Sequence, residues 1–288
     1  MHLLFPDGRP FSLDAPRIMG VLNVTPDSFS DGGRFTSVDA AVRHGQAMIQ
    51  EGADLIDIGG QSTRPGAQAV PALEQIHRLV PVIAALARPT AAIPRPVPIS
   101  VDADDPVVAA AALDAGATII NDIYAGQRPG MLELAAARKA PIILMHMQGT
   151  PATMQQNPQY TDVVAQVRDF LLERAAAARA AGVAAQRIVL DPGLGFGKTL
   201  EHNLKLLQNL DVLRKTGYPV LLGASRKSSL AQLGRGPQGE VPRPDETVGA
   251  TCATTTWGVW HGVHLFRVHD VRANRQAAQV AWALRQVS

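Results

Sequence analysis

Short apolar runs rich in β-branched residues recur along the chain, and longer segments with mixed polar and apolar positions separate them. A short run that is apolar at nearly every position predicts a strand that is buried on both faces. Eight such runs occur, at residues 18–24, 55–58, 98–101, 119–123, 141–147, 188–190, 219–223 and 263–268. We therefore expect eight buried strands.

The segments between these runs have the period of an amphipathic helix. In the clearest case the period places Leu73, Ile76, Val80 and Ile83 on one predicted face. Strands that alternate with helices pair in parallel through right-handed crossovers, and eight such units are the number that closes a barrel. The pattern therefore predicts an α/β fold, a (β/α)8 TIM barrel, with a doubly wound open sheet as the alternative.

The two ends of the chain lie outside this repeat. Residues 3–5 and 11–13 flank a turn at 6–9, which predicts an N-terminal β-hairpin within residues 1–15 that could plug the N-terminal end of the barrel. A final helix is predicted over 270–287, with Asp270 as its N-cap. Because no irregular stretch is followed by a new pattern, we expect one domain over residues 1–288.

Composition and charge narrow the class of protein. The hydrophobic share is 46% and the charged share 18%, as in a globular chain with a large aliphatic core. The formal net charge is only +2 and the basic residues are scattered, so we expect no nucleic-acid partner. The sequence has no secretory signal pattern and no apolar run of transmembrane length, which predicts a cytoplasmic protein without a membrane partner.

Polar residues follow nearly every apolar run. In a parallel barrel the carboxyl ends of the strands form one rim, so these residues should converge there. Each alone could belong to an ordinary turn or helix start, but independent turns have no reason to place reactive side chains on the same rim. The residues are Asn23, Thr63, Arg64, Asp102, Asn121, Asp122, His146, Asp191, Ser225, Arg226, Lys227, Arg267 and His269.

One glycine-rich segment, residues 193–199 (GLGFGKT), looks like a phosphate-binding P-loop. The P-loop pattern requires glycine five positions before Gly197, where this chain has Pro192. Proline also has no backbone N–H with which to bind a phosphate. The spacing therefore disfavours a nucleotide-hydrolysing function.

Seven separated blocks are more specific than any single motif. They are residues 19–33 (MGVLNVTPDSFSDGG), 62–66 (STRPG), 120–123 (INDI), 144–149 (LMHMQG), 191–198 (DPGLGFGK), 225–228 (SRKS) and 267–270 (RVHD). With these blocks the chain resembles the dihydropteroate synthase family across essentially its whole length. The resemblance implies a transferase of folate biosynthesis that condenses 6-hydroxymethyl-7,8-dihydropterin diphosphate with para-aminobenzoate and releases pyrophosphate. Two departures occur: Gln61 replaces the usual Glu, and residues 102–105 (DADD) replace DTxK.

The resemblance also implies roles for individual residues of this chain. The catalytic residues would be Asp31, Asp102 and Lys227. The pterin would be bound by Asp102, Asn121, Met145, Asp191, Lys227 and Arg267. The diphosphate would be bound by Asn23, Thr63, Arg64, Arg267 and His269. The para-aminobenzoate pocket would be formed by Phe29, Pro65, Phe196 and Ser225. The cofactor Mg²⁺ would be held by Asn23 and Asp31, and the family suggests a homodimer.

Residue chemistry agrees with these roles, and two other functions stay open. An ionised Asp191 can accept paired hydrogen bonds from a pterin, and cations beside a departing diphosphate can neutralise its charge. One alternative is a pterin-dependent methyltransferase, which needs no diphosphate site. The Arg267 and His269 pair and the long first loop, 25–35, favour the synthase. The other alternative is a catalytically silent pterin-binding paralogue.

Overall fold

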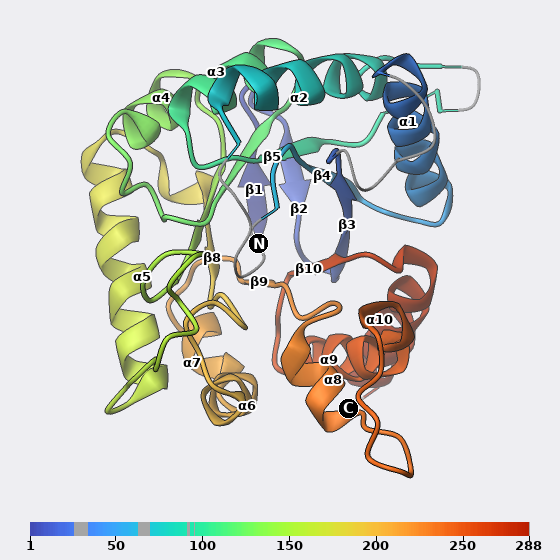
Figure 1. Cartoon of the computed structure of the whole chain (residues 1–288). Coiled ribbons are helices and arrows are strands. Elements are labelled where there is room, and N and C mark those ends of the chain that lie inside the picture. The colour runs from blue at the N-terminus through green and yellow to red at the C-terminus, as the bar shows by residue number, and fades with distance from the viewer. Residues whose placement is uncertain (26–33, 63–69, 91–92, 95, 288) are drawn as a thin grey trace.

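The computed structural model describes residues 1–25, 34–62, 70–90, 93–94 and 96–287. Within them, eight parallel strands form a barrel in the order β8-β7-β6-β5-β4-β3-β10-β9, and helices surround it (Figure 1). A parallel bridge between Leu190 and Val220 joins the two end strands, so the sheet closes on itself. The predicted TIM barrel is confirmed, and the open-sheet alternative is wrong.

The eight barrel strands coincide with the eight predicted runs to within a few residues. They are β3 Arg17–Asn23, β4 Leu55–Gly59, β5 Ile99–Asp102, β6 Ile119–Asp122, β7 Ile142–Met145, β8 Ile188–Asp191, β9 Leu221–Leu222 and β10 Leu265–Val268. The strand β9 is much shorter than its predicted run, 219–223, which begins at Pro219. Proline has no N–H with which to continue a ladder of hydrogen bonds.

The helices fill the segments between the strands and lie on the outside of the barrel (Figure 1). The α-helices are α1 Arg34–Gln50, α2 Ala72–Leu86, α3 Pro106–Asp114, α4 Met131–Ala137, α5 Val163–Ala180, α6 Leu200–Gln208, α7 Leu210–Arg214, α8 Ser228–Leu233, α9 Val248–Trp260 and α10 Val271–Gln286. Within the described residues, the 3₁₀ turns are η2 Ala185–Arg187 and η3 Pro244–Glu246. Among the described residues, none of the helices has the length and apolar character that a membrane span requires.

The predicted inner face of α2 is wrong in part. Leu73 is 73% exposed, although the period placed it with Ile83, which is fully buried. The side chains that α2 buries are Gln75, Leu79, Val82, Ile83 and Leu86. Because the sequence of α2 is apolar on more than one side, its period alone did not identify the side that packs against the barrel.

The start of α10 also differs from the prediction. Asp270 occupies the N-cap position, but its side chain makes no capping hydrogen bond. Its two carboxylate oxygens instead accept hydrogen bonds from the guanidinium of Arg226, at 3.2 and 2.8 Å. The bidentate ion pair takes the carboxylate away from the helix end, because a charged donor binds it more strongly than a backbone N–H does.

The N-terminal hairpin plugs the barrel as predicted. Strands β1 His2–Leu4 and β2 Pro10–Ser12 pair antiparallel. The apolar side chains Leu3, Phe5 and Leu13 are buried against the first inward-facing layer of the barrel. That layer consists of Met19, Leu55, Ile119, Ile143, Val189, Leu221 and Leu265. Apolar packing therefore closes this end, and any ligand must enter from the other one.

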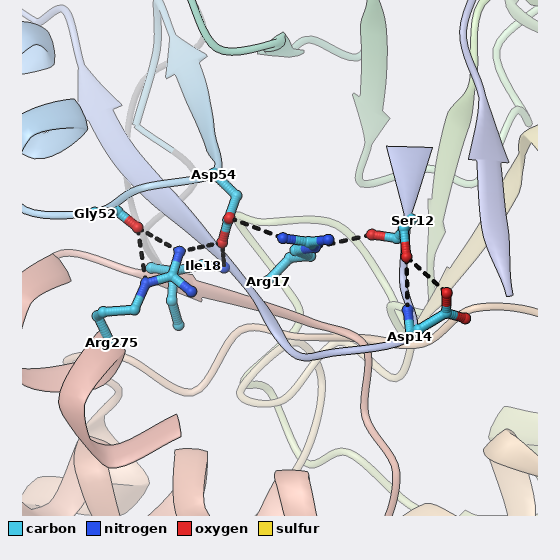
Figure 2. Close-up of polar contacts among 7 residues, drawn as sticks. All are labelled: Ser12, Asp14, Arg17, Ile18, Gly52, Asp54 and Arg275. Atoms are coloured by element: carbon cyan, nitrogen blue, oxygen red, sulfur yellow. Dashed lines mark hydrogen bonds and ion pairs between the residues drawn. The ribbon is translucent and has the colours of Figure 1, made fainter. Parts of the chain in front are cut away.

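A polar network at the same closed end joins segments that are far apart in sequence (Figure 2). The carboxylate of Asp54 accepts hydrogen bonds from the backbone N–H of Ile18 at 2.8 Å and from the guanidinium groups of Arg17 and Arg275. Arg17 also donates to the carbonyl oxygen of Ser12 at 2.8 Å. The network ties the hairpin, β3 and α10 together on the side opposite the predicted rim.

Candidate functional site

The alternation of side chains along each strand builds the site. Residues two positions apart in a strand point to the same face, so a second inward-facing layer lies above the apolar one. At five strands the pairs are Ile119 with Asn121, Ile143 with Met145, Val189 with Asp191, Leu221 with Gly223, and Leu265 with Arg267. A pocket opens at this level, lined by Asp102, Asn121, Ile123, Met145, Asp191, Gly193, Leu194, Phe196, Gly223, Lys227 and Arg267.

Most of the described candidate residues converge on this pocket. Seven line it: Asp102, Asn121, Met145, Asp191, Phe196, Lys227 and Arg267. Asn23 is close by, because a Cβ atom added at Gly59 would lie 3.7 Å from the Oδ1 of Asn23 and 3.7 Å from the Oδ2 of Asp102. Five other candidates lie outside the described residues: Phe29, Asp31, Thr63, Arg64 and Pro65.

A guanidinium between two carboxylates forms one wall of the pocket. The Nη2 of Arg267 donates to the Oδ2 of Asp102 at 2.8 Å, and its Nε donates to the Oδ2 of Asp57 at 2.6 Å. Burial raises the pKa of the Asp102 carboxyl to about 7, although Arg267 opposes this rise. The pKa of Arg267 is raised because the favourable charges of Asp57 and Asp102 outweigh its desolvation, so the guanidinium stays protonated.

Asp57 was not among the site residues predicted from the sequence. Its side chain is completely buried within the barrel, and its Oδ2 accepts hydrogen bonds from both Arg267 and the Nδ2 of Asn121, the latter at 3.1 Å. A signal was present in the sequence, because Asp57 is the only charged residue of the run 55–58. A buried carboxylate in an apolar strand requires partners, and here those partners are two pocket residues.

The pocket lining also contains an ammonium group and an aromatic ring. The Nζ of Lys227 lies 4.1 Å from the centroid of the Phe196 ring, which is a cation–π contact. The Oδ1 of Asp191 accepts a hydrogen bond from the backbone N–H of Gly193 at 2.7 Å. Burial raises the pKa of Asp191, while that hydrogen bond and the charges of Lys227 and Arg267 oppose the rise. The pocket therefore places acceptors beside cationic donors.

The glycine-rich segment that resembles a P-loop folds around its own lysine. Lys198 is 3% exposed, and its Nζ donates hydrogen bonds to the carbonyl oxygens of Gly193 and Phe196, both at 2.9 Å. The same Nζ lies 2.9 Å from the Nδ1 of His146. A Cβ atom at Gly193, where φ is +63°, would lie 1.9 Å from the carbonyl oxygen of His146. Lys198 therefore supports the loop that carries Phe196.

His146 gives a pH-dependent prediction. Burial, and next the charge of Lys198, lower its pKa to about 3, against 6.5 for the unfolded chain. Between these values the unfolded state binds a proton that the folded state does not, so stability falls as the pH drops from about 6.5 toward about 3. Replacing His146 with Gln should remove about 1 kcal/mol of this loss per pH unit, as measured by urea unfolding. A His77→Gln variant on the exposed side of α2 is the control, and equal slopes in both variants would refute the assignment.

Several rim residues are engaged in local structure. The Oγ of Ser225 lies 3.0 Å from the Nδ1 of His269 and accepts from the backbone N–H of His269 at 3.2 Å. Ser225 is only 6% exposed. A ligand carboxylate that accepted a hydrogen bond from its Oγ would therefore have to displace the ring of His269. Asp122 accepts two backbone N–H bonds of the following turn, at 2.9 and 2.6 Å, and burial raises its pKa to about 6. Asp122 is therefore a turn residue.

Gln61, one departure from the family pattern, contacts the segment 102–105 that contains the other. The Nε2 of Gln61 donates to the Oδ1 of Asp104 at 3.1 Å, and the Oδ2 of Asp104 pairs with Arg128 at 3.3 Å. Asp105 caps α3 by accepting the backbone N–H of Val107 at 2.8 Å. A Glu at position 61 would face the Asp104 carboxylate, whereas the amide of Gln can donate to it. Gln61 is therefore compatible with Asp104.

The described residues contain no cluster of three or more His, Cys, Asp or Glu side chains that could hold a metal ion. Oxygen donors do lie near each other at the rim, in the side chains of Asn23 and Asp102 beside Gly59. Such a small oxygen set suits a hard cation that keeps several waters and is shared with substrate phosphates. It does not suit a metal that the protein holds alone.

Comparisons with known proteins agree with this geometry. The model of a family described as "Pterin binding enzyme" matches residues 19–269. The chain is 44% identical over 280 residues to the dihydropteroate synthase of Escherichia coli (strain K12), covering 97% of this chain and 95% of that protein. The structure of the Xanthomonas albilineans dihydropteroate synthase with 4-aminobenzoic acid superposes with a TM-score of 0.88 and 46% identity, covering 98% and 97% of the two chains. The Xanthomonas albilineans enzyme in complex with 7,8-dihydropteroate gives a TM-score of 0.86 and 42% identity, with 100% of both chains covered.

Proposed function

Because the chain belongs to the pterin-binding enzyme family and has the activity of a dihydropteroate synthase, we propose that its rim pocket holds the dihydropterin of the substrate. The reaction joins 6-hydroxymethyl-7,8-dihydropterin diphosphate to para-aminobenzoate and yields 7,8-dihydropteroate and pyrophosphate. One observation supports the assignment most: Asp191, Asn121 and Lys227, which together offer acceptors and a cation, line the same pocket. The methyltransferase alternative does not account for the matched enzymes.

The polar side chains of the pocket suit the edges of a pterin. A reduced pterin carries an amino group and ring N–H donors along one edge, and an ionised Asp191 can accept a pair of them. Asn121 and Asp102 meet the remaining edges, and Lys227 donates to ring acceptors. Met145 packs against the ring as an adaptable apolar neighbour. Few polar atoms of the bound pterin are then left without a partner.

The diphosphate would lie at the mouth of the pocket. Its departing negative charge must be met by donors and cations that are already in position. Arg267 lines the pocket from β10, and His269 follows it two residues later. Asn23 lies at the end of neighbouring β3, and Thr63 and Arg64 are the further candidates for this role.

Loss of the diphosphate leaves a methylene cation conjugated to an electron-rich pterin. We propose a dissociative substitution in which Asp102 and Asp31 offer negative charge beside this cation, after which the arylamine nitrogen bonds to the methylene carbon and loses one N–H proton to water or to the departing pyrophosphate. A weakly basic aromatic amine needs positioning more than activation. Residues 25–35 and 61–67 would complete the pocket around it.

The para-aminobenzoate would occupy the outer part of the site. Phe196, whose ring contacts Lys227, would form one apolar wall, and Phe29 and Pro65 are the other candidates. Ser225 would meet the carboxylate in exchange for its contact with His269. The likeness to the Xanthomonas albilineans enzyme with 4-aminobenzoic acid supports a ligand of this kind.

Mg²⁺ is the cofactor that we propose. When bound with the substrate, it would neutralise phosphate charge. The Oδ1 of Asn23 is a suitable ligand beside Asp102, and Asp31 is the second candidate ligand.

A coupled assay tests the proposed function. Purified protein, Mg²⁺ and 6-hydroxymethyl-7,8-dihydropterin diphosphate would be incubated with and without para-aminobenzoate, and both pyrophosphate and dihydropteroate would be measured. Dihydropteroate that requires both substrates is the expected result. Pterin binding without coupling would instead indicate a silent paralogue, and the segment around Gln61 and Asp104 would then be tested first.

Replacing Lys227 with Ala should weaken binding of the pterin diphosphate by about tenfold or more, because a charged hydrogen bond to the ring is lost. The fold should stay intact, since Lys227 lies at the start of short α8, outside the core. Calorimetric titration measures the affinity, and circular dichroism checks the fold. A Lys215→Ala variant is the control, because the ammonium of Lys215 pairs with Asp211 on the surface. Unchanged binding in the Lys227 variant would remove this residue from the site.

We also infer a homodimeric, single-domain protein of the cytoplasm. Exposed apolar side chains on the C-terminal helices α9 and α10 support an interface there: Trp257, Trp260, Val280 and Leu284. The barrel pattern continues through the chain without a break into a second unit, which supports a single domain. Light scattering at several concentrations tests the oligomeric state.

A further inference from the structure

We propose that Asp57, although it does not line the pocket, is a positioning residue that sets which hydrogen bonds Asn121 and Arg267 offer to the pterin. The inference rests on the proposed function, because it assumes that the pterin occupies the pocket. Asp57 lies inside the barrel on β4, completely buried, and its Oδ2 contacts both residues. It is the only charged residue of β4.

Asp57 determines the orientation of the Asn121 amide. The Oδ2 of Asp57 already accepts the Nε–H of Arg267, so the group of Asn121 that faces this acceptor at 3.1 Å is its Nδ2. The chemistry of the partner therefore decides the orientation of the amide. With its Nδ2 committed inside the barrel, Asn121 presents its Oδ1 as an acceptor to the pocket. A ligand must meet that oxygen with an N–H donor, such as a ring N–H of the dihydropterin on an edge other than the one that Asp191 meets.

Asp57 also holds the plane of the Arg267 guanidinium. Its Nε is held by Asp57 at 2.6 Å and its Nη2 by Asp102 at 2.8 Å. Two contacts on different nitrogens fix a planar group against rotation about its long axis. Removing Asp57 would leave the contact to Asp102 as a pivot about which the guanidinium could swing. One buried carboxylate thus positions a proposed pterin contact and a proposed diphosphate contact together.

The acceptor oxygen of Asp57 is the property that its two partners require. Both donors meet the same oxygen, Oδ2, whereas Oδ1 has no partner within the described part of the chain. The hydroxyl of Ser100, the register partner of Asp57 on β5, is also unpartnered there. An Asn at position 57 could place its oxygen where Oδ2 is and turn its amide nitrogen toward Ser100. An acceptor oxygen, more than the negative charge, is therefore the predicted requirement.

The test compares Asp57→Leu with Asp57→Asn, both as full chains. Leucine has a similar shape and no acceptor, so the KM for dihydropterin diphosphate should rise at least about tenfold, while the KM for para-aminobenzoate stays within about twofold. The Asn variant should stay within about fivefold of the unmodified protein for both substrates, because its oxygen keeps the two hydrogen bonds. Ser100→Ala is the matched control, since it removes a buried polar neighbour whose hydroxyl has no hydrogen-bond partner among the described residues.

A second pair of variants keeps the proposal testable if Asp57→Leu does not fold. Asn121→Asp places two carboxylates face to face and should lose pterin affinity. Adding Asp57→Asn should recover only part of that loss, about threefold or more, because its amide nitrogen can donate to the carboxylate introduced at position 121 but then replaces the oxygen that Arg267 meets. Calorimetry with the pterin diphosphate is the measurement. Absence of restoration, or equal rises of both KM values in Asp57→Leu, would overturn the proposal.

Binding measurements distinguish failure of the proposed function from failure of the role of Asp57. If the unmodified protein does not bind dihydropterin diphosphate, or binds it without any effect of Asp191→Asn, the proposed function fails. If the unmodified protein binds it and the Asp57→Leu variant binds it equally well, the proposed function stands and only the role of Asp57 is refuted.

Discussion

Replacing Asp191 with Asn is expected to lower kcat/KM for dihydropterin diphosphate by about a thousandfold. The Oδ1 of Asp191 already accepts the backbone N–H of Gly193 at 2.7 Å, so an Asn would keep its oxygen there and turn its amide nitrogen into the pocket. One charged hydrogen bond to the pterin, worth about 1.5 to 3 kcal/mol, would then meet a donor in place of an acceptor, and the other would lose the carboxylate charge. Steady-state kinetics with varied pterin diphosphate measures the loss.

The fold of the Asp191→Asn variant should change little, because the hydrogen bond to Gly193 survives. An Asp211→Asn variant, which alters an exposed carboxylate paired with Lys215, is the matched control. A loss confined to the Asp191 variant is the expected pattern. Retention of more than about a tenth of the original kcat/KM would mean that the pterin does not meet this carboxylate.

Replacing Arg267 with Ala is expected to lower the free energy of unfolding by about 3 to 5 kcal/mol. The guanidinium is the partner of both Asp57, which is completely buried, and Asp102, whose side chain is 12% exposed. Without it, two carboxylates face each other inside the barrel. Urea unfolding at neutral pH, followed by circular dichroism, measures the change.

The sign of the pH dependence provides a second readout for the Arg267→Ala variant. Burial already raises the pKa of Asp102 to about 7, and loss of Arg267 would raise it further. The native state of the variant would then keep this proton to a higher pH than the unmodified protein does, so its deficit in unfolding free energy should be largest at alkaline pH and should shrink as the pH falls toward about 7. Arg138→Ala, on an exposed pair with Asp114, should show neither effect. Equal stability of both variants would contradict the prediction.

The sequence was sufficient for the architecture of the barrel. Strands buried on both faces are apolar at nearly every position, so the eight runs stood out without any tertiary information. The N-terminal hairpin was predictable from its turn residues and from the apolar side chains Leu3, Phe5 and Leu13, which need an apolar surface to cover. Strand ends were less well predicted, as β9 shows, because the length of a ladder depends on which neighbours can donate.

The rim of the site was also predictable, because the carboxyl ends of parallel strands meet whatever the loops do. Asp102, Asn121, Asp191, Lys227 and Arg267 therefore converge as expected. Side chains two residues apart in a strand point to the same face, so the second inward-facing layer of the barrel was predictable from the strand period alone.

Other features were decided only by tertiary structure. The face that α2 buries, the pairing of Asp270 with Arg226 and the burial of Lys198 beneath its own loop each depend on a partner that is remote in sequence or on a loop conformation. Asp57 is the clearest case, because its partner Arg267 lies 210 residues away. Periodicity tells which way a side chain points along its own strand, but the hydrogen bonds of a buried polar group depend on which other strands the closed barrel places opposite it.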